Sequence, residues 1–206
     1  MTKDTGRRAR AEERALFGGA GIATFSEMLV IGLGVTFMAL PLITFVPAFA
    51  AGTRHLHAHL DHEPDSLQKL LVRSMQAIRS GWWFGTASAV VLGLLILNVI
   101  GASRGLLPGG MPLATVSGAL TVVIGVAVLR TAGLWRPGAR WSDLWRAGRN
   151  VTVDDPIGSL FVIVGIGVSI AVVWMLPPLI VIAPGLTVMS VVAAERRRVS
   201  AAKRKL

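Results

Sequence analysis

Long stretches without charge restrict this chain to membrane-type folds. The last of them covers residues 157–194, which contain no ionisable side chain, and the first covers 22–52, where Glu27 is the only one. A single membrane-spanning helix needs about 20 apolar residues. Charged residues make up 16% of the chain, whereas a soluble domain carries about 25%. The sequence therefore predicts one all-α, polytopic domain whose surroundings are a lipid bilayer.

Two proline pairs divide the first and last of these stretches. Pro41 and Pro47 are six residues apart, and Pro178 and Pro184 repeat the spacing within a similar Pro-Leu-Ile pattern. Proline interrupts a helix because it lacks the backbone N–H and crowds the preceding turn. Paired interruptions in two halves of a membrane protein indicate an internal repeat of broken helices. We expect the two turns, with Thr44 between the first prolines, to form a candidate binding cavity or packed core.

The positions of the basic residues favour one topology. If every apolar stretch crossed once, Lys and Arg would divide 12 to 9 between the two sides. If the first and last stretches fold back at their prolines, 20 of the 21 lie on one side and only Arg104 on the other. Cytoplasmic loops carry an excess of Lys and Arg. We therefore expect about six membrane segments in a bacterial inner (plasma) membrane, with both termini cytoplasmic.

One part of this topology has two solutions. The arm 41–52 is only about a dozen apolar residues long, which is short for a complete crossing. It either crosses with stretched backbone at Pro47 or re-enters on the side from which it came. Irregular backbone at membrane depth is tolerated only where protein or a cavity surrounds it.

The single domain divides into seven parts, in which two proline-broken hairpins flank a central helix pair and two amphipathic helices lie at the interface. The parts are a cytoplasmic arm (1–21), the first hairpin (22–60), an amphipathic helix (65–80), the central pair (82–134), an interfacial segment (135–155), the second hairpin (156–194) and a basic tail (195–206). In the interfacial segment, Trp141 and Trp145 are expected at headgroup depth. Asp155 is expected to cap the helix that begins at Pro156.

The helix predicted for 65–80 has one apolar and one basic face. Asp65 and Gln68 have the spacing of a capping box, and Leu71 and Met75 belong to the apolar face. This helix is expected to lie at the membrane surface or to dock a cytoplasmic partner. The candidate docking residues are its cations Lys69, Arg73 and Arg79.

All four histidines lie between residues 55 and 62. In a continuous helix His55, His59 and His62 share one face, a spacing that can hold zinc. The sequence contains no second cluster of such ligands, so a metal site is the less favoured interpretation and no cofactor is expected. The net charge of +10 does not indicate nucleic-acid binding, because the basic residues flank apolar spans.

Several short motifs resemble those of the YesL family of bacterial integral membrane proteins. The N-terminal motifs are Leu40-Pro41-Leu42-Ile43-Thr44, Pro47-Ala48 and Arg54-His55-Leu56. The C-terminal motifs are Asp155-Pro156-Ile157-Gly158-Ser159, Leu176-Pro177-Pro178-Leu179, Pro184-Gly185 and Ala194-Glu195-Arg196-Arg197. The resemblance covers roughly 22–198. The family has no established activity, but its members occur beside carbohydrate ABC importers and glycoside hydrolases.

Three functions are therefore considered. The resemblance implies a role accessory to ABC-type carbohydrate transport, with a transporter permease as partner. The alternative is a membrane scaffold or assembly factor without transport activity. A metal-dependent membrane enzyme is least favoured, because beyond the histidines the sequence shows no catalytic triad, no paired intramembrane carboxylates and no phosphate-binding loop. We expect that the protein is not an enzyme.

Overall fold

The computed structural model of the protein describes residues 28–29, 31–34, 44–60, 67–176, 179–180 and 182–203. Within these ranges the chain forms helices α3 (Phe45–Leu60), α4 (Leu67–Ser103), α5 (Gly110–Gly133), α6 (Trp141–Asp154), α7 (Pro156–Met175) and α8 (Ala183–Lys203). Three stretches are long and apolar enough to cross a membrane, namely Leu71–Ser103, Gly110–Gly133 and Pro156–Met175. The prediction of an all-α membrane protein is confirmed, and the number of crossings stays a prediction.

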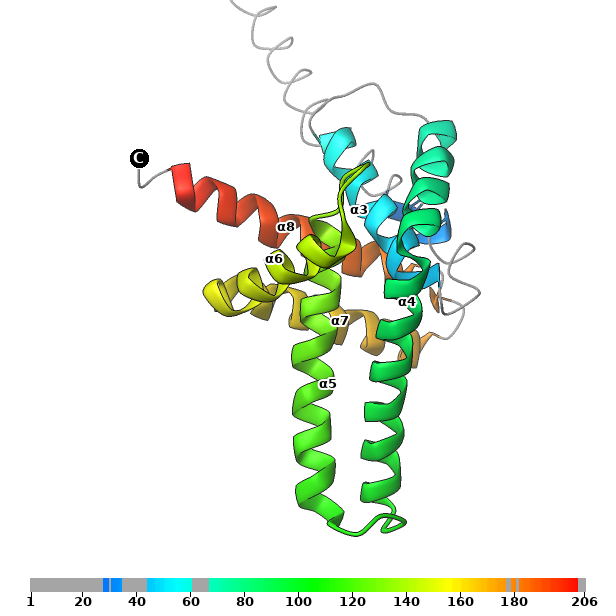
Figure 1. Ribbon diagram of the computed structural model, residues 1–206, viewed down its shortest axis with the longest axis vertical. Helices are drawn as coiled ribbons and strands as arrows, with labels where there is room; N and C mark the ends of the chain where they lie inside the picture. The colour runs from blue at the N-terminus through cyan, green and yellow to red at the C-terminus, as the bar shows by residue number, and fades with distance from the viewer. Residues whose placement is uncertain are drawn as a thin grey trace, which may run out of the picture.

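Helices α4 and α5 form a long antiparallel hairpin (Figure 1). The connection between them turns at Gly105 and Gly109, whose φ angles of 71° and 103° are strained for residues with a side chain. Large apolar side chains are exposed along the hairpin, among them Leu94, Leu97, Val116 and Val123. An apolar surface of this extent needs a cover, and the acyl chains of a bilayer provide one.

Helix α4 continues without a break through the point where the sequence predicted a new element. The separate amphipathic helix at 65–80 and the span that follows it are one helix of 37 residues. No proline interrupts the chain between 67 and 103, so the helical hydrogen bonds run on. At 1.5 Å per residue, 82–103 measures about 33 Å, enough to cross a hydrocarbon core, and 67–81 adds about 22 Å. The predicted capping residue Asp65 lies outside the described residues.

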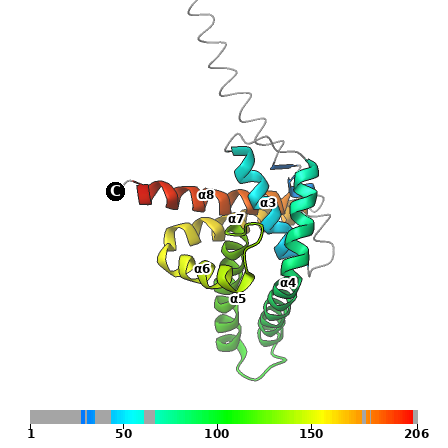
Figure 2. The ribbon, with the colours of Figure 1, turned by 45° about the horizontal axis from the view of Figure 1, so that its top comes forward.

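Helices α7 and α8 form a second hairpin, which lies across the first one instead of parallel to it (Figures 1 and 2). Helix α8 packs against α7 and α3, and α3 in turn packs against α4 and α5. The core that joins these helices is apolar and fully enclosed. It includes Phe49 and Leu56 from α3, Val126 from α5, and Val188 and Val191 from α8.

The second proline of each pair stands at the beginning of a helix. Pro47 is the third residue of α3, and Pro184 is the second residue of α8. In the first helical turn the missing N–H has no intrahelical acceptor, so proline is tolerated there. The last apolar stretch breaks between Met175 of α7 and Ala183 of α8, so the prediction that it divides into two helices at its prolines is confirmed. Pro47 lies within α3, so the predicted alternative of stretched backbone at Pro47 is wrong. Pro41 and Pro178 lie outside the described residues.

Candidate functional site

The described parts of both proline turns line one cavity. Its volume is about 680 Å³, and its walls include Phe45 from α3 together with Ile180 and Pro184 from the second turn. Apolar side chains make up most of the lining. Two hydroxyls of this lining, those of Ser169 and Thr187, are hydrogen-bonded to each other at 3.1 Å. Pro47 is buried and Thr44 is half-buried, but neither of them lines the cavity.

This cavity lies beside the middle of the α4–α5 hairpin. Its lining includes Leu92, about 15 Å along α4 from Trp82, and Gly125, about 12 Å along α5 from Gly133. The α7–α8 turn therefore stops halfway along the hairpin, well short of the tip at 104–109 (Figure 1). The sequence predicted two membrane segments for the second hairpin, and this number stays a prediction. In the structure, α7 crosses the first hairpin obliquely instead of running along it (Figure 1).

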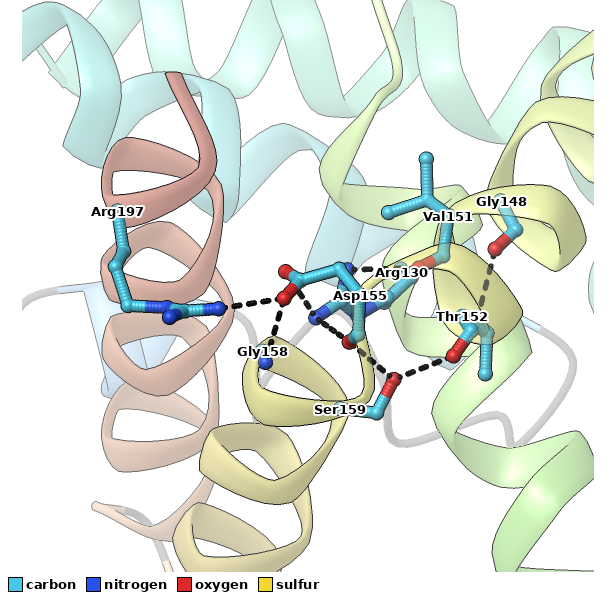
Figure 3. A network of polar contacts seen from close by, with 8 residues as sticks. All are labelled: Arg130, Gly148, Val151, Thr152, Asp155, Gly158, Ser159 and Arg197. Carbon is cyan, nitrogen blue, oxygen red and sulfur yellow. Dashed lines mark hydrogen bonds and ion pairs between the residues drawn. The ribbon is translucent and has the colours of Figure 1, made fainter. Parts of the chain in front are cut away.

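A buried ion pair joins three helices near the basic end of α5 (Figure 3). The side chain of Arg130 is 1% exposed, and its Nη2 lies 3.2 Å from Oδ2 of Asp155. Its Nη1 donates to the carbonyl oxygen of Val151 at 3.4 Å. Arg197 of α8 pairs with the other carboxylate oxygen of Asp155. We call Arg130, Asp155 and Arg197 the buried ion network, which ties α5 and α8 to the start of α7.

Asp155 is also the N-cap of α7, as the sequence predicted. Its Oδ1 accepts a hydrogen bond of 3.0 Å from the N–H of Gly158, and Pro156 occupies the first helical position. The hydroxyl of Ser159 donates to the carbonyl oxygen of Thr152 at 2.9 Å. Burial alone would raise the pKa of Asp155. The Gly158 hydrogen bond, the Arg130 hydrogen bond and the nearby arginine charges outweigh burial and lower the pKa below its usual 3.8.

Sequence reasoning missed the ion pairs of this network. The sequence pattern indicates only that Arg130 is a charge at the end of a span. A signal for its role exists, because Arg130 stands four residues before the end of the apolar stretch 112–134. An ionisable side chain at such depth almost always faces the protein interior and pairs with another polar group.

The predicted docking helix leaves part of its apolar face exposed. Leu71 and Met75 of this face are 54% and 72% exposed, so they do not pack into the described part of the protein. The small residues Ser74 and Ala77 of α4 are buried, and α4 packs against α3. Arg79 is exposed and Arg73 half-buried, while the side chain of Lys69 lies outside the description.

The predicted metal site at the histidines lies partly outside the described residues. His55 is buried in α3, while His62 and the side chain of His59 lie outside the described residues. In the described part of the chain no three His, Asp or Glu side chains come together as metal ligands. The hypothesis of a metal site with these histidines stays a prediction.

Comparison of the chain with protein-family models, with curated proteins and with solved structures finds no match. The resemblance to the YesL family, and the function that it implies, therefore rest on the sequence motifs alone.

Proposed function

We propose that this chain is an integral membrane protein accessory to ABC-type carbohydrate import, and that it acts by docking the transporter permease and not by catalysis. One observation favours docking over catalysis. Helix α4 extends far beyond the part that matches the thickness of a bilayer, and this extension carries an exposed apolar face. The carbohydrate importer as partner rests on the YesL resemblance.

The exposed face of the α4 extension consists of Leu71, Val72 and Met75, with Arg79 one turn further along. The three apolar side chains are 52–72% exposed. If 82–103 crosses the bilayer, these three residues lie about 10–17 Å along α4 from Trp82, on the side away from the membrane, where acyl chains do not reach. An apolar patch with a basic edge in water is typical of a protein interface. Its complement is an amphipathic permease surface with an acidic residue opposite Arg79.

A scaffold that stabilises other membrane proteins without affecting transport would use the same face. The two functions differ in their consequence for the cell. Loss of an import accessory lowers the uptake of at least one carbohydrate, whereas loss of a scaffold changes only the amount or assembly of its partner. Measurement of uptake therefore separates the two functions.

The test combines a deletion strain with two charge variants. We expect the doubly substituted Leu71→Glu/Met75→Glu protein to fold and insert, because both side chains are exposed, but to lose the permease and to reproduce the uptake defect of the deletion strain. Leu106→Glu is the matched control, because Leu106 is 74% exposed at the opposite end of the hairpin. Normal uptake of every carbohydrate tested in the deletion strain would refute the accessory role.

A further inference from the structure

A second cavity opens beside the basic end of the α4–α5 hairpin. Its volume is about 510 Å³, within the range of about 300–1,000 Å³ that is typical of small-molecule sites. Three parts of the fold contribute its walls, which are the end of α3, the link between α5 and α6, and the last turns of α8. Its lining is mainly polar, unlike that of the cavity between the proline turns.

Cations dominate this cavity. Arg54 comes from α3, Arg136 from the α5–α6 link and Arg196 from α8, and Glu195 is the one carboxylate among the residues that line it. Arg54 and Arg196 are half-buried, so water screens their charges less than those of surface arginines. His57 adds a further nitrogen to the wall. Among the described residues that line the cavity, three arginines therefore outnumber one carboxylate.

Two features reduce the repulsion that an anion would meet there. Burial raises the pKa of Glu195, and this effect outweighs the nearby arginine charges. The carboxyl group of Glu195 therefore holds its proton to higher pH than an exposed glutamate does. Two carbonyl groups at the end of α5 are also occupied, because the N–H groups of Leu134 and Trp135 donate to the carbonyls of Arg130 and Ala132.

We propose that this cavity binds a phosphate group, carried either by a lipid headgroup or by a soluble phosphate ester. Guanidinium groups match phosphate because their parallel N–H bonds engage two oxygens at once. The position in the fold agrees with this chemistry. Gly133 and Leu134 at the end of the apolar helix α5 line the cavity, so a bilayer that the hairpin crosses would place its lipid phosphates near this level.

The experiment uses the full chain in dodecyl maltoside, a detergent without phosphate, and two kinds of probe. Phosphatidylglycerol, detected by native mass spectrometry, tests the lipid source, and glycerol 3-phosphate, detected by titration calorimetry, tests the soluble source. Each is compared between the wild type and the doubly substituted Arg136→Gln/Arg196→Gln protein. We expect at least one probe to bind roughly tenfold more weakly for each arginine removed.

Arg149→Gln is the matched control, because Arg149 is an exposed arginine of α6 that does not line the cavity. This control should bind both probes like the wild type. A double variant that fails to fold is replaced by Arg136→Gln alone, whose side chain is exposed. Selection of phosphatidylglycerol identifies a headgroup site, and binding of glycerol 3-phosphate alone identifies a soluble ligand. The proposal is wrong if neither probe binds, or if the Arg149→Gln control loses as much affinity as the cavity variants.

Discussion

At the scale of single residues, Asp155 has the largest number of separate tasks in the described structure. It neutralises Arg130, which is enclosed by protein, it pairs with Arg197, and it caps α7 through the N–H of Gly158. An arginine removed from water is costly unless a carboxylate and hydrogen-bond acceptors surround it. Removal of the Asp155 charge therefore affects three helices at once.

We expect Asp155→Asn to destabilise the protein by about 3–5 kcal/mol at pH 7, the usual cost when one partner of a buried ion pair is removed. Asparagine keeps an oxygen that can accept from Gly158, so the loss is mainly one of charge. Because the pKa of Asp155 is lower in the folded state, its contribution is complete above the unfolded value and disappears as pH falls through the folded value. Thermal unfolding in detergent at pH 7 and at pH 3 measures the difference.

Asp143→Asn provides the control for this substitution. Asp143 also pairs with an arginine, Arg146, but both side chains are more than half exposed, and exposed pairs contribute about 0–1 kcal/mol. An equal loss of stability in both variants, or a deficit of Asp155→Asn that stays constant down to pH 3, would contradict the role assigned to the buried ion network.

The sequence predicted one task of Asp155 and not the others, for a physical reason. The cap depends on neighbours in the chain, since Pro156 and Gly158 follow directly. The ion pairs depend on Arg130 and Arg197, which are 25 and 42 residues away. Only the packing of α5 and α8 brings these charges together.

At the scale of helices, α6 owes its place to two glycines that allow close contact. The ring of Trp141 packs directly over Gly81 of α4, stacks on Phe84 with centroids 5.2 Å apart, and donates from Nε1 to Ser80 at 3.1 Å. Trp141 is therefore buried within the protein, and its predicted position at headgroup depth stays a prediction. Further along α6, Gly148 lies against Thr131 of α5.

We expect Gly148→Ala to destabilise the protein by about 1–3 kcal/mol, the usual cost of overpacking. A methyl group there would overlap the hydroxyl of Thr131 and approach its Cα at 2.8 Å and its backbone nitrogen at 2.9 Å. Backbone atoms cannot move aside as a flexible side chain does, so α6 would shift away from α5. Thermal unfolding in detergent, followed by tryptophan fluorescence, measures this loss.

Gly167→Ala is the matched control within α7. In the described part of the chain, no atom outside the backbone of α7 lies within 4 Å of a Cβ at Gly167. Alanine therefore adds helix propensity there without a clash, and the variant should be as stable as the wild type or more stable. Equal destabilisation by both substitutions would show that the α5–α6 contact does not limit stability.

At the scale of the whole molecule, the sequence predicted the class of fold, a helical membrane protein, better than the inclination of its helices. Charge-free stretches and basic flanks were enough to predict an all-α membrane protein. They did not predict that α7 runs obliquely across the first hairpin, because hydropathy indicates that a helix prefers lipid and not how it is inclined. The meeting of the two proline turns in an apolar cavity also depends on this tilt.

We expect single cysteines to report three different environments in cells. The chain contains no native cysteine, so each substituted thiol is the only target of a membrane-impermeant reagent. Leu106→Cys at the hairpin tip should react from outside, and Met75→Cys on the α4 extension only after the cytoplasmic side is opened. Met175→Cys, at the end of α7, should react from neither side, because the α7–α8 turn lies beside the middle of the first hairpin.

Labelling in detergent is the control for the expected lack of reaction at Met175→Cys. Met175 is 74% exposed on the protein surface, so its cysteine should react once detergent replaces the bilayer. Labelling of Met175→Cys from outside would mean that the second hairpin crosses the membrane completely, and labelling from the cytoplasm that it lies on the surface. Either outcome would overturn a turn at mid-depth, and labelling of Met75→Cys and Leu106→Cys from the same side would overturn the topology as a whole.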